Sequence, residues 1–553
     1  MAESKKSRSA APPPTRKTSL YRLQQDEGNP DLRALVRRRY LDREGFQARP
    51  VEHGPVRGLL VTGTITPGPA DWCAALAELT GLEVSEENHT SFGLLLVRTE
   101  HHVYALSHGM GHLMIEPARI DPGFGIRFAV RCLDKDRITK VRRQVMDARG
   151  RSDENSVASG EHIRGFGIEE FGEIVSQVAG RISGVPLTFT GDGDRTAHIT
   201  GNDRSVKLRL SQSPEGLMRD LRAVEEVCAR PDPLPEFEFI TQVRPLPGAS
   251  DLAQRLNERL DTMLGSSNPG RVALAVPSEC RERFDQAETY RVTVAGRRET
   301  VSELDADILT NAVRTRPPGK RLEELRKGKV QMFSDTELRE AISGAVSAKK
   351  WLAAEVTEDH VHYFLWQGQW YEVGAEYLKA VNRRVTELLG RPSGVTLPPW
   401  SEGDEGAYNK KAANREGYVH LDKNNVRTKR LKGGGWEVCD LLGPEGQLIH
   451  VKKAPTGTAP LNHLFAQAMM CAETLHYDTE ARTKFTAKLD EIAPDHPADR
   501  DFAEPTVVLG ILLKEGEPVT ADSLFSFAQI SLLHTDNVLK GLGARLEVVS
   551  IRR

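Results

Sequence analysis

Runs of apolar and β-branched residues, separated by polar segments, recur from the first third of the chain onward. Residues 57–64 (RGLLVTGT) and 91–98 (SFGLLLVR) predict two strands, with a helix between them at 71–80. Residues 125–131 predict a further strand, and 134–149 a charged helix. This order of elements indicates a mixed α/β beginning of the chain.

The ends of the predicted helices and strands are marked more clearly in the second half of the chain. Residues 360–373 (HVHYFLWQGQWYEV) alternate around a central glycine and predict a hairpin, and 375–389 predict a helix closed by Gly390. The later pattern predicts strands at 436–442 and 448–453, a helix at 461–475, a helix at 479–492, a strand at 506–513, a helix at 522–540 and a strand at 546–551. The predicted fold class is therefore α/β (α+β).

Length and breaks in composition predict several domains. At roughly 100–200 residues per domain, 553 residues exceed a single core. A Ser/Gly-rich loop and the linker-like sequence RTRPPGKR separate the predicted parts. The expected division is a disordered basic tail at 1–18, a mixed α/β domain at 19–150, an α/β middle domain at 166–316, and a C-terminal region at 325–553 with a core at about 400–553.

Composition excludes some classes of protein. With 75 basic and 78 acidic side chains, the chain is not a basic protein that coats a polyanion, so any nucleic-acid surface has to be local. The six cysteines form no Cys-x-x-Cys pair, which argues against a zinc ribbon and against a disulfide framework. No apolar run approaches the roughly 18 residues that span a bilayer, and the first residues lack the apolar centre of a signal peptide. We expect a cytoplasmic protein without a membrane partner.

The hairpin predicted from WEVCDLLGPEGQLIHVKK holds the residues best suited to chemistry. Its turn brings Asp440 on one strand beside His450 on the other, and alternation puts His450 and Lys452 on one face. Glu437 and Asp440 differ by three positions and should point to opposite faces of a regular strand, which leaves Glu437 as a reserve ligand. The alternative is an ordinary hairpin with solvated lysines, in which Asp440 and Lys452 form a cross-strand ion pair.

The order of acidic residue, hairpin, x-Lys strand and Gln-bearing helix resembles the PD-(D/E)xK superfamily of restriction-endonuclease-like proteins, and most closely its Mrr-type members. The resemblance implies a three-layer α/β domain with a mixed sheet and a metal-dependent endonuclease using Mg²⁺ or Mn²⁺. It implies Asp440 as metal ligand, Lys452 as catalytic lysine and Gln467 as a helix residue facing the site. His450 stands where the family has an acidic residue or Gln, as second metal ligand or orienter.

The whole chain also resembles a sporadically distributed bacterial family of uncharacterised proteins, through VYALSHGMGHLMIEP, FGIRFAV and LNHLFAQA. Patchy occurrence is typical of phage-defence genes, which favours hydrolysis of foreign or modified DNA. The expected partners are nucleic acid and further copies of the chain in a homo-oligomer. Cations immediately before the hairpin are the predicted phosphate contacts: Lys423, Arg427, Lys429, Arg430 and Lys432. The rival functions are a nucleic-acid- or partner-binding protein with an inactive nuclease fold, and a toxin that acts on RNA.

Overall fold

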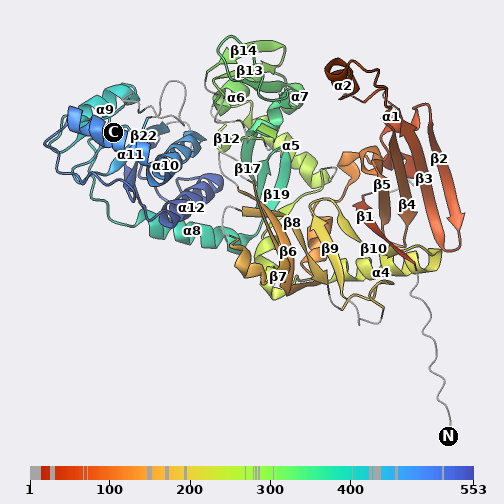
Figure 1. Ribbon diagram of the computed structural model, residues 1–553. Helices are drawn as coiled ribbons and strands as arrows, with labels where there is room; N and C mark the ends of the chain where they lie inside the picture. The colour runs from red at the N-terminus through yellow and green to blue at the C-terminus, as the bar shows by residue number, and fades with distance from the viewer. Residues whose placement is uncertain are drawn as a thin grey trace, which may run out of the picture. The chain divides into compact units, whose positions relative to one another are not determined.

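The computed structural model describes all residues except 1–13, 25–30, 67, 71, 146–151, 169–172, 183, 192–195, 249, 268, 278, 281–282, 284–286, 303, 402, 423–425, 427–436, 455–458 and 514–515. The chain forms two compact units (Figure 1). Unit 1 comprises Met1–Arg143, Asp153–Ile168 and Val175–Ser250, and unit 2 comprises Gln144–Ser152, Glu169–Ile174 and Asp251–Arg553. A mixed α+β fold, as predicted, is confirmed. Within the described residues, no helix is long and apolar enough to cross a membrane.

Unit 1 is built on a ten-stranded sheet with the order β2-β3-β4-β5-β1-β10-β9-β8-β6-β7. Neighbouring strands from β2 across to β8 pair antiparallel. The strands are β1 (Thr15–Leu23), β2 (Phe46–His53), β3 (Val56–Ile65), β4 (Thr90–Arg98), β5 (Val103–Gly109), β6 (Leu133–Val145), β7 (Ser152–Glu161), β8 (Glu173–Ile182), β9 (Ala197–Asn202) and β10 (Val206–Ser211).

Both faces of this sheet pack against helical segments. On one face, apolar residues such as Leu20 and Leu208 join α3 (Phe124–Ala129) and α4 (Pro214–Ala229) in one core. On the other face, a smaller core covers β2 to β5 and part of β1 with short helices. These short helices are η1 (Leu32–Leu35), α1 (Arg38–Leu41) and η2 (Gly111–Met114). On this same face, strands β8, β9 and β10 contribute no residue to the smaller core.

Two features of unit 1 depend on local packing. A Cβ added at Gly125 of α3 would lie 1.9 Å from the carbonyl oxygen of Ser205, so the helix can approach the sheet only with glycine there. Helix α2 (Trp72–Thr80) extends from the β3–β4 connection, and its Leu79 is 81% exposed. In this helix only Cys73 is buried, so its apolar face is open.

Two elements of unit 1 differ from the sequence predictions. The predicted strand at 125–131 is helix α3, which begins after Gly123 in the left-handed region at φ 73°. The described part of the predicted helix at 134–149 is strand β6, which ends at Val145. Its buried residues imitate helical spacing, but Ile138 and Val141 are β-branched and the neighbouring strands supply backbone partners. For residues 125–131, a short apolar run does not by itself distinguish a buried helix from a strand.

The first part of unit 2 holds two antiparallel sheets. One contains β12 (Val272–Leu274), β17 (Leu352–Glu358), β18 (Val361–Trp366) and β19 (Gln369–Val373). The other has the order β14-β13-β15-β16, with β13 (Thr289–Val294), β14 (Arg297–Val301), β15 (Lys329–Phe333) and β16 (Val346–Ser347). The helices are α5 (Asp251–Met263), α6 (Ala306–Arg314), α7 (Arg321–Lys327) and α8 (Ala375–Leu389). The predicted hairpin and the helix after it are confirmed.

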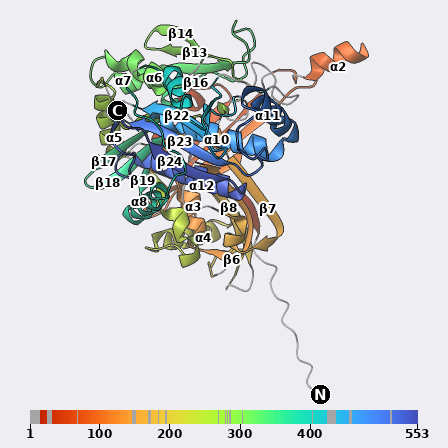
Figure 2. The ribbon, with the colours of Figure 1, turned by 90° about the vertical axis from the view of Figure 1, so that its left-hand side faces the viewer.

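The second part of unit 2 is a five-stranded mixed sheet with the order β20-β21-β22-β23-β24. Figure 2 labels three of these strands, β22, β23 and β24, together with α10 and α12. Strands β20 to β22 pair antiparallel, whereas β22 to β24 pair parallel. The elements are α9 (Glu405–Ala413), β20 (Val419–His420), β21 (Leu441–Leu442), β22 (Leu448–Ala454), α10 (Ala459–Tyr477), α11 (Thr479–Ile492), β23 (Thr506–Leu513), α12 (Ser526–Gly541) and β24 (Arg545–Ser550). Alternate β22 residues pack toward α10 and toward α9, so helices cover both faces.

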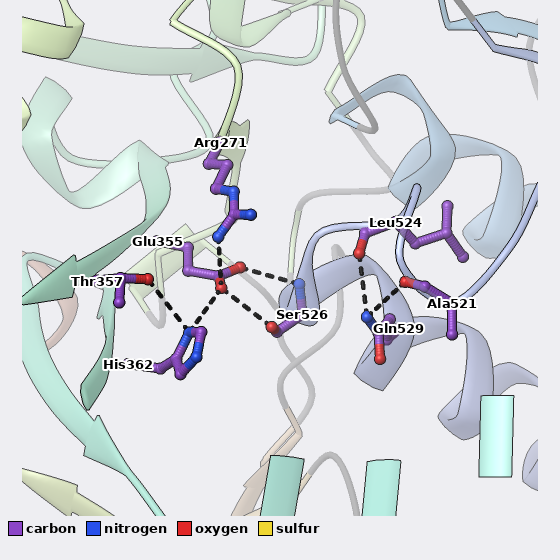
Figure 3. A network of polar contacts seen from close by, with 8 residues as sticks. All are labelled: Arg271, Glu355, Thr357, His362, Ala521, Leu524, Ser526 and Gln529. Atoms are coloured by element: carbon purple, nitrogen blue, oxygen red, sulfur yellow. Dashed lines mark hydrogen bonds and ion pairs between the residues drawn. The ribbon is translucent and has the colours of Figure 1, made fainter. Parts of the chain in front are cut away.

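A buried carboxylate joins β17 to the start of α12 (Figure 3). Glu355 Oε2 accepts a hydrogen bond from the backbone N–H of Ser526 at 2.9 Å, and Oε1 accepts one from the Ser526 hydroxyl at 3.0 Å. Arg271 Nη1 lies 3.2 Å and His362 Nδ1 3.3 Å from Oε1. No side chain at the N-cap position of α12 bonds to its first turn, so Glu355 supplies the anion at this helix end from another element.

Candidate metal centre

Asp440 is held in place by the backbone at the edge of the mixed sheet. Its N–H donates to the carbonyl of Ile449 at 3.0 Å. Its own carbonyl accepts from the N–H groups of Leu421 and Asp422, both at 2.9 Å. The residue therefore ties β22 to the segment that follows β20, and this brings the Asp422 side chain beside it.

Three carboxylates converge at this point. Ligand oxygens of Asp422, Glu437 and Asp440 all lie within 4.8 Å of one another, and each side chain is half-buried. Asp440 Oδ2 accepts the N–H of Val451 at 2.7 Å, and Oδ1 accepts from Asn409 Nδ2 of α9 at 3.2 Å. Glu437 and Asp440 thus come from one stretch of the chain, whereas Asp422, Val451 and Asn409 come from three others.

The electrostatics of the cluster act on Asp440. Burial raises its pKa to about 7, against the hydrogen bond from Val451, and the nearby Glu437, Asp422 and Glu405 add to the rise. Carboxylates this close repel one another when ionised, so one of them tends to hold a proton. A divalent cation bound between them would remove the repulsion and favour the ionised form of Asp440.

The prediction that Glu437 and Asp440 point to opposite faces is wrong. Opposite faces require a regular strand across the predicted range 436–442. Strand β21 contains only Leu441–Leu442, and residues 437–440 are not strand, so alternation does not apply to them. Glu437 consequently lies in the same group as Asp440.

Lys452 lies on β22 and pairs with a glutamate from α9. Its Nζ is 3.3 Å from Glu405 Oε2, and the N–H of Lys453 donates to Oε1 of the same carboxylate at 3.2 Å. The first turn of α9 also reaches the carboxylate cluster, because a Cβ added at Gly406 would lie 3.4 Å from Asp422 Oδ2. Glu405 is therefore the link between the predicted lysine and the cluster.

His450 and Gln467 lie elsewhere. His450 is 4% exposed, its Nε2 has no hydrogen-bond partner among the described residues, and burial lowers its pKa to about 4. The carboxylate group found in the described part of the chain does not include it. Gln467 is half-buried on α10, and the described contacts include none between its side chain and the three carboxylates. The predicted phosphate contacts Lys423, Arg427, Lys429, Arg430 and Lys432 lie outside the described residues.

Sequence reasoning missed Asp422, Glu405 and Asn409. Asp422 ends a stretch that reads as a strand shortly before the hairpin, and this acidic strand end was an available signal. Glu405 directly follows Asp404, which caps α9 by accepting the N–H of Ala407. That capping pattern marks the start of a helix, but nothing local indicates that the helix faces Lys452.

The chain belongs to DUF6119, a family of unknown function, which it matches over residues 18–552. The expected membership of an uncharacterised family is thereby confirmed. Among curated proteins, no relative matches the chain.

Proposed function

We propose that the mixed-sheet part of unit 2, about residues 400–553, is a metal-dependent nuclease that hydrolyses phosphodiester bonds in DNA. The observation that carries the proposal is the group formed by Asp422, Glu437 and Asp440, whose ligand oxygens lie within 4.8 Å of one another. A lysine, Lys452, stands on the strand whose backbone holds Asp440. Carboxylates with an adjacent lysine are the groups that this reaction needs.

The donor set fits a hard divalent cation. All three ligands are carboxylates, which suit Mg²⁺ or Mn²⁺ better than a softer metal. The raised pKa of Asp440 is the expected result of crowded anions that a cation would neutralise. A bound Mg²⁺ or Mn²⁺ would polarise a phosphate oxygen and lower the pKa of a coordinated water. We assign the cation to Asp422, Glu437 and Asp440 in preference to the buried imidazole of His450.

The remaining residues would position the substrate and the water. Lys452 donates from its ammonium to a non-bridging phosphate oxygen or to the attacking water, and Glu405 holds this ammonium in place beforehand. Asn409 fixes one oxygen of Asp440 and leaves the carboxylate with a defined orientation.

The arrangement of the helices and strands also supports a nuclease domain. A mixed sheet, antiparallel from β20 to β22 and parallel from β22 to β24, lies between α9 and α10. This is the three-layer order that the resemblance to restriction-endonuclease-like proteins implies. The proposed biological role is defence against foreign or modified DNA in the cytoplasm, with substrate recognition in the preceding two thirds of the chain.

Metal binding is the first test. Isothermal titration of the full chain with Mn²⁺ should give a binding event that Asp440→Ala abolishes and Glu437→Gln weakens at least about tenfold. The matched control is Asp495→Asn, which removes an exposed carboxylate of the same domain and should leave binding unchanged. Equal binding by the natural chain and Asp440→Ala would refute the centre.

Cleavage is the second test. Supercoiled plasmid, linear duplex and structured RNA are each incubated with the chain in Mg²⁺ or Mn²⁺, and Lys452→Met and Asp440→Ala serve as variants. Plasmid nicking that requires the metal and both residues supports the proposal. Cutting that survives both substitutions places the chemistry elsewhere, and metal binding without any cutting favours the non-catalytic rival. Cutting confined to RNA favours the toxin.

A further inference from the structure

The sheet of unit 1 carries exposed cations on the part of its face that the smaller core does not cover. Cross-strand pairing sets Lys17 of β1 opposite Arg209 of β10, and Ser19 opposite Lys207. Lys17, Lys207 and Arg209 are exposed, whereas Leu208 between the last two is buried in the core with α3 and α4. Alternation therefore directs the three cations to the face away from that core.

The same face continues across β9 and β8. His198 lies opposite Arg181, and both are exposed. Thr200 lies opposite Lys207, so it joins the two groups of cations. Burial lowers the pKa of His198, and the charges of Lys17 and Arg181 lower it further. The imidazole thus stands in a positive environment that spans four neighbouring strands, from β1 to β8.

Within the described residues, these cations have no acidic partner. No carboxylate of the described residues lies within ion-pair distance of Lys17, Lys207 or Arg181. Elsewhere in the sheet cations are neutralised, since Lys140 and Arg142 of β6 both pair with Glu154 of β7. Like charges directly opposite each other destabilise a strand pair, so Lys17 facing Arg209 costs stability unless an anion lies over them.

We infer that this cationic face, made of Lys17, Arg181, His198, Lys207 and Arg209, binds the phosphate backbone of duplex DNA. Strands lie about 4.8 Å apart and alternate residues about 7 Å apart, so the cations form a flat array of the spacing that suits successive phosphates. Among the described residues of β1, β8, β9 and β10, no Phe, Tyr or Trp is exposed.

Proteins that hold single strands generally stack bases on aromatic side chains. The Phe189 ring beside this face is half-buried, and the Arg209 guanidinium already lies over it, 5.1 Å from the ring centroid, so it is not free to stack a base. A duplex, whose bases are already stacked inside, fits better. The inference rests on the proposed function in that the ligand is a nucleic acid, and it adds a second region of contact in unit 1.

The test measures binding without cleavage. Fluorescence anisotropy follows a fluorescein-labelled 30-bp duplex titrated with the full chain in EDTA, at NaCl concentrations from 50 to 300 mM. The patch variant combines Lys17→Gln, Lys207→Gln and Arg209→Gln. Because each neutralised phosphate contact contributes about 0.9 to the slope of log Kd against log salt, the slope should fall by about 2 to 3. The Kd at 100 mM NaCl should rise at least about tenfold.

A matched triple variant controls for net charge. Lys379→Gln, Arg384→Gln and Lys484→Gln remove three cations that each pair with a glutamate in their own helix. This control should change the Kd less than about twofold. Equal losses in the two triple variants, or no loss in the patch variant, would overturn the inference. Tighter binding of a single strand than of the duplex would also overturn it.

The duplex-binding test can fail or succeed independently of the test of the proposed nuclease. Asp440→Ala should bind the duplex in EDTA like the natural chain, and the patch variant should bind Mn²⁺ with unchanged affinity. A natural chain that binds the duplex in EDTA but binds no Mn²⁺ would sink the nuclease proposal and leave this inference standing. Circular dichroism at 222 nm and the thermal midpoint confirm that the patch variant is folded, so a weakened Kd is a binding effect.

Discussion

Replacing Glu355 with glutamine should destabilise unit 2 although the side chain keeps its shape. The carboxylate accepts hydrogen bonds from the N–H and the hydroxyl of Ser526 and from the Arg271 guanidinium, and the His362 imidazole lies beside it (Figure 3). A glutamine has one acceptor oxygen, so its amide N–H₂ must face at least one of these donors. The N–H at the start of α12 then loses its anionic partner.

The size of the loss in unfolding free energy depends on which donors cannot form a hydrogen bond to water instead. Arg271 is 54% exposed and regains water, so its loss contributes little. An unsatisfied donor at Ser526 costs about 1–3 kcal/mol, and the loss of negative charge at a helix N-terminus about 0.5–1 kcal/mol. We expect the free energy of unfolding to fall by about 2–4 kcal/mol.

Urea unfolding followed by tryptophan fluorescence measures this change, because five of the six tryptophans lie in unit 2. The control is Glu376→Gln, whose carboxylate is 81% exposed and pairs with Lys379 in the same helix, and it should cost less than about 0.5 kcal/mol. If Glu355→Gln unfolds at the same urea midpoint as this control, the carboxylate does not secure the helix and the reasoning fails.

The pH dependence gives an independent check. Burial pushes the pKa of Glu355 upward, but His362, Arg271 and Ser526 outweigh it and hold the pKa below its usual value of 4.5. A lowered folded-state pKa contributes stability that is present above the unfolded value and is lost as the pH falls through the folded value. The difference between the natural chain and Glu355→Gln should therefore be constant above about pH 5 and shrink in more acidic solution.

Three further substitutions test other parts of the fold. Burial lowers the pKa of Lys349 to about 8, so Lys349→Met should raise the free energy of unfolding by about 2–3 kcal/mol below pH 8, and urea titrations should show the gain vanishing toward pH 10.5. Gly125→Ala forces a Cβ to 1.9 Å from the Ser205 carbonyl and should cost more than about 3 kcal/mol in thermal unfolding, whereas Gly248→Ala, with open space around it, should cost less than about 1 kcal/mol. Leu79→Ser should leave the thermal midpoint within about 2 °C and lower the binding of the dye ANS, because Leu79 is 81% exposed; a large drop in midpoint would mean that α2 is packed.

The parts of the fold that sequence predicted correctly are those with local signals. Residues 360–373 turn around a glycine and alternate on both sides, and the helix Ala375–Leu389 closes at Gly390. Strand β6 lacks such a signal, because its buried residues occur at helical spacing and only the neighbouring strands decide its conformation. Pairing partners distant in sequence are invisible to a local pattern.

The same distinction applies to the candidate site. Asp440 and Lys452 belong to one hairpin, whose turn makes their neighbourhood predictable. Asp422 reaches Asp440 through backbone hydrogen bonds between separate segments, and Glu405 comes from a helix on one face of the sheet. Glu437 was misjudged for a different reason, since strand alternation was applied to residues that are not strand.

The parallel pairing of β22 with β23 sets the moment during synthesis at which the carboxylate cluster can form. Every carboxylate of the cluster has left the ribosome before Thr506–Leu513 is translated. Until then β22 lacks its second neighbour, and Ile449 and Val451 lack Val508 and Leu512 to pack against. A nascent or truncated chain that stops before β23 thus carries the acidic residues without the sheet that orients them. Such a chain has the metal ligands but not the arranged metal site.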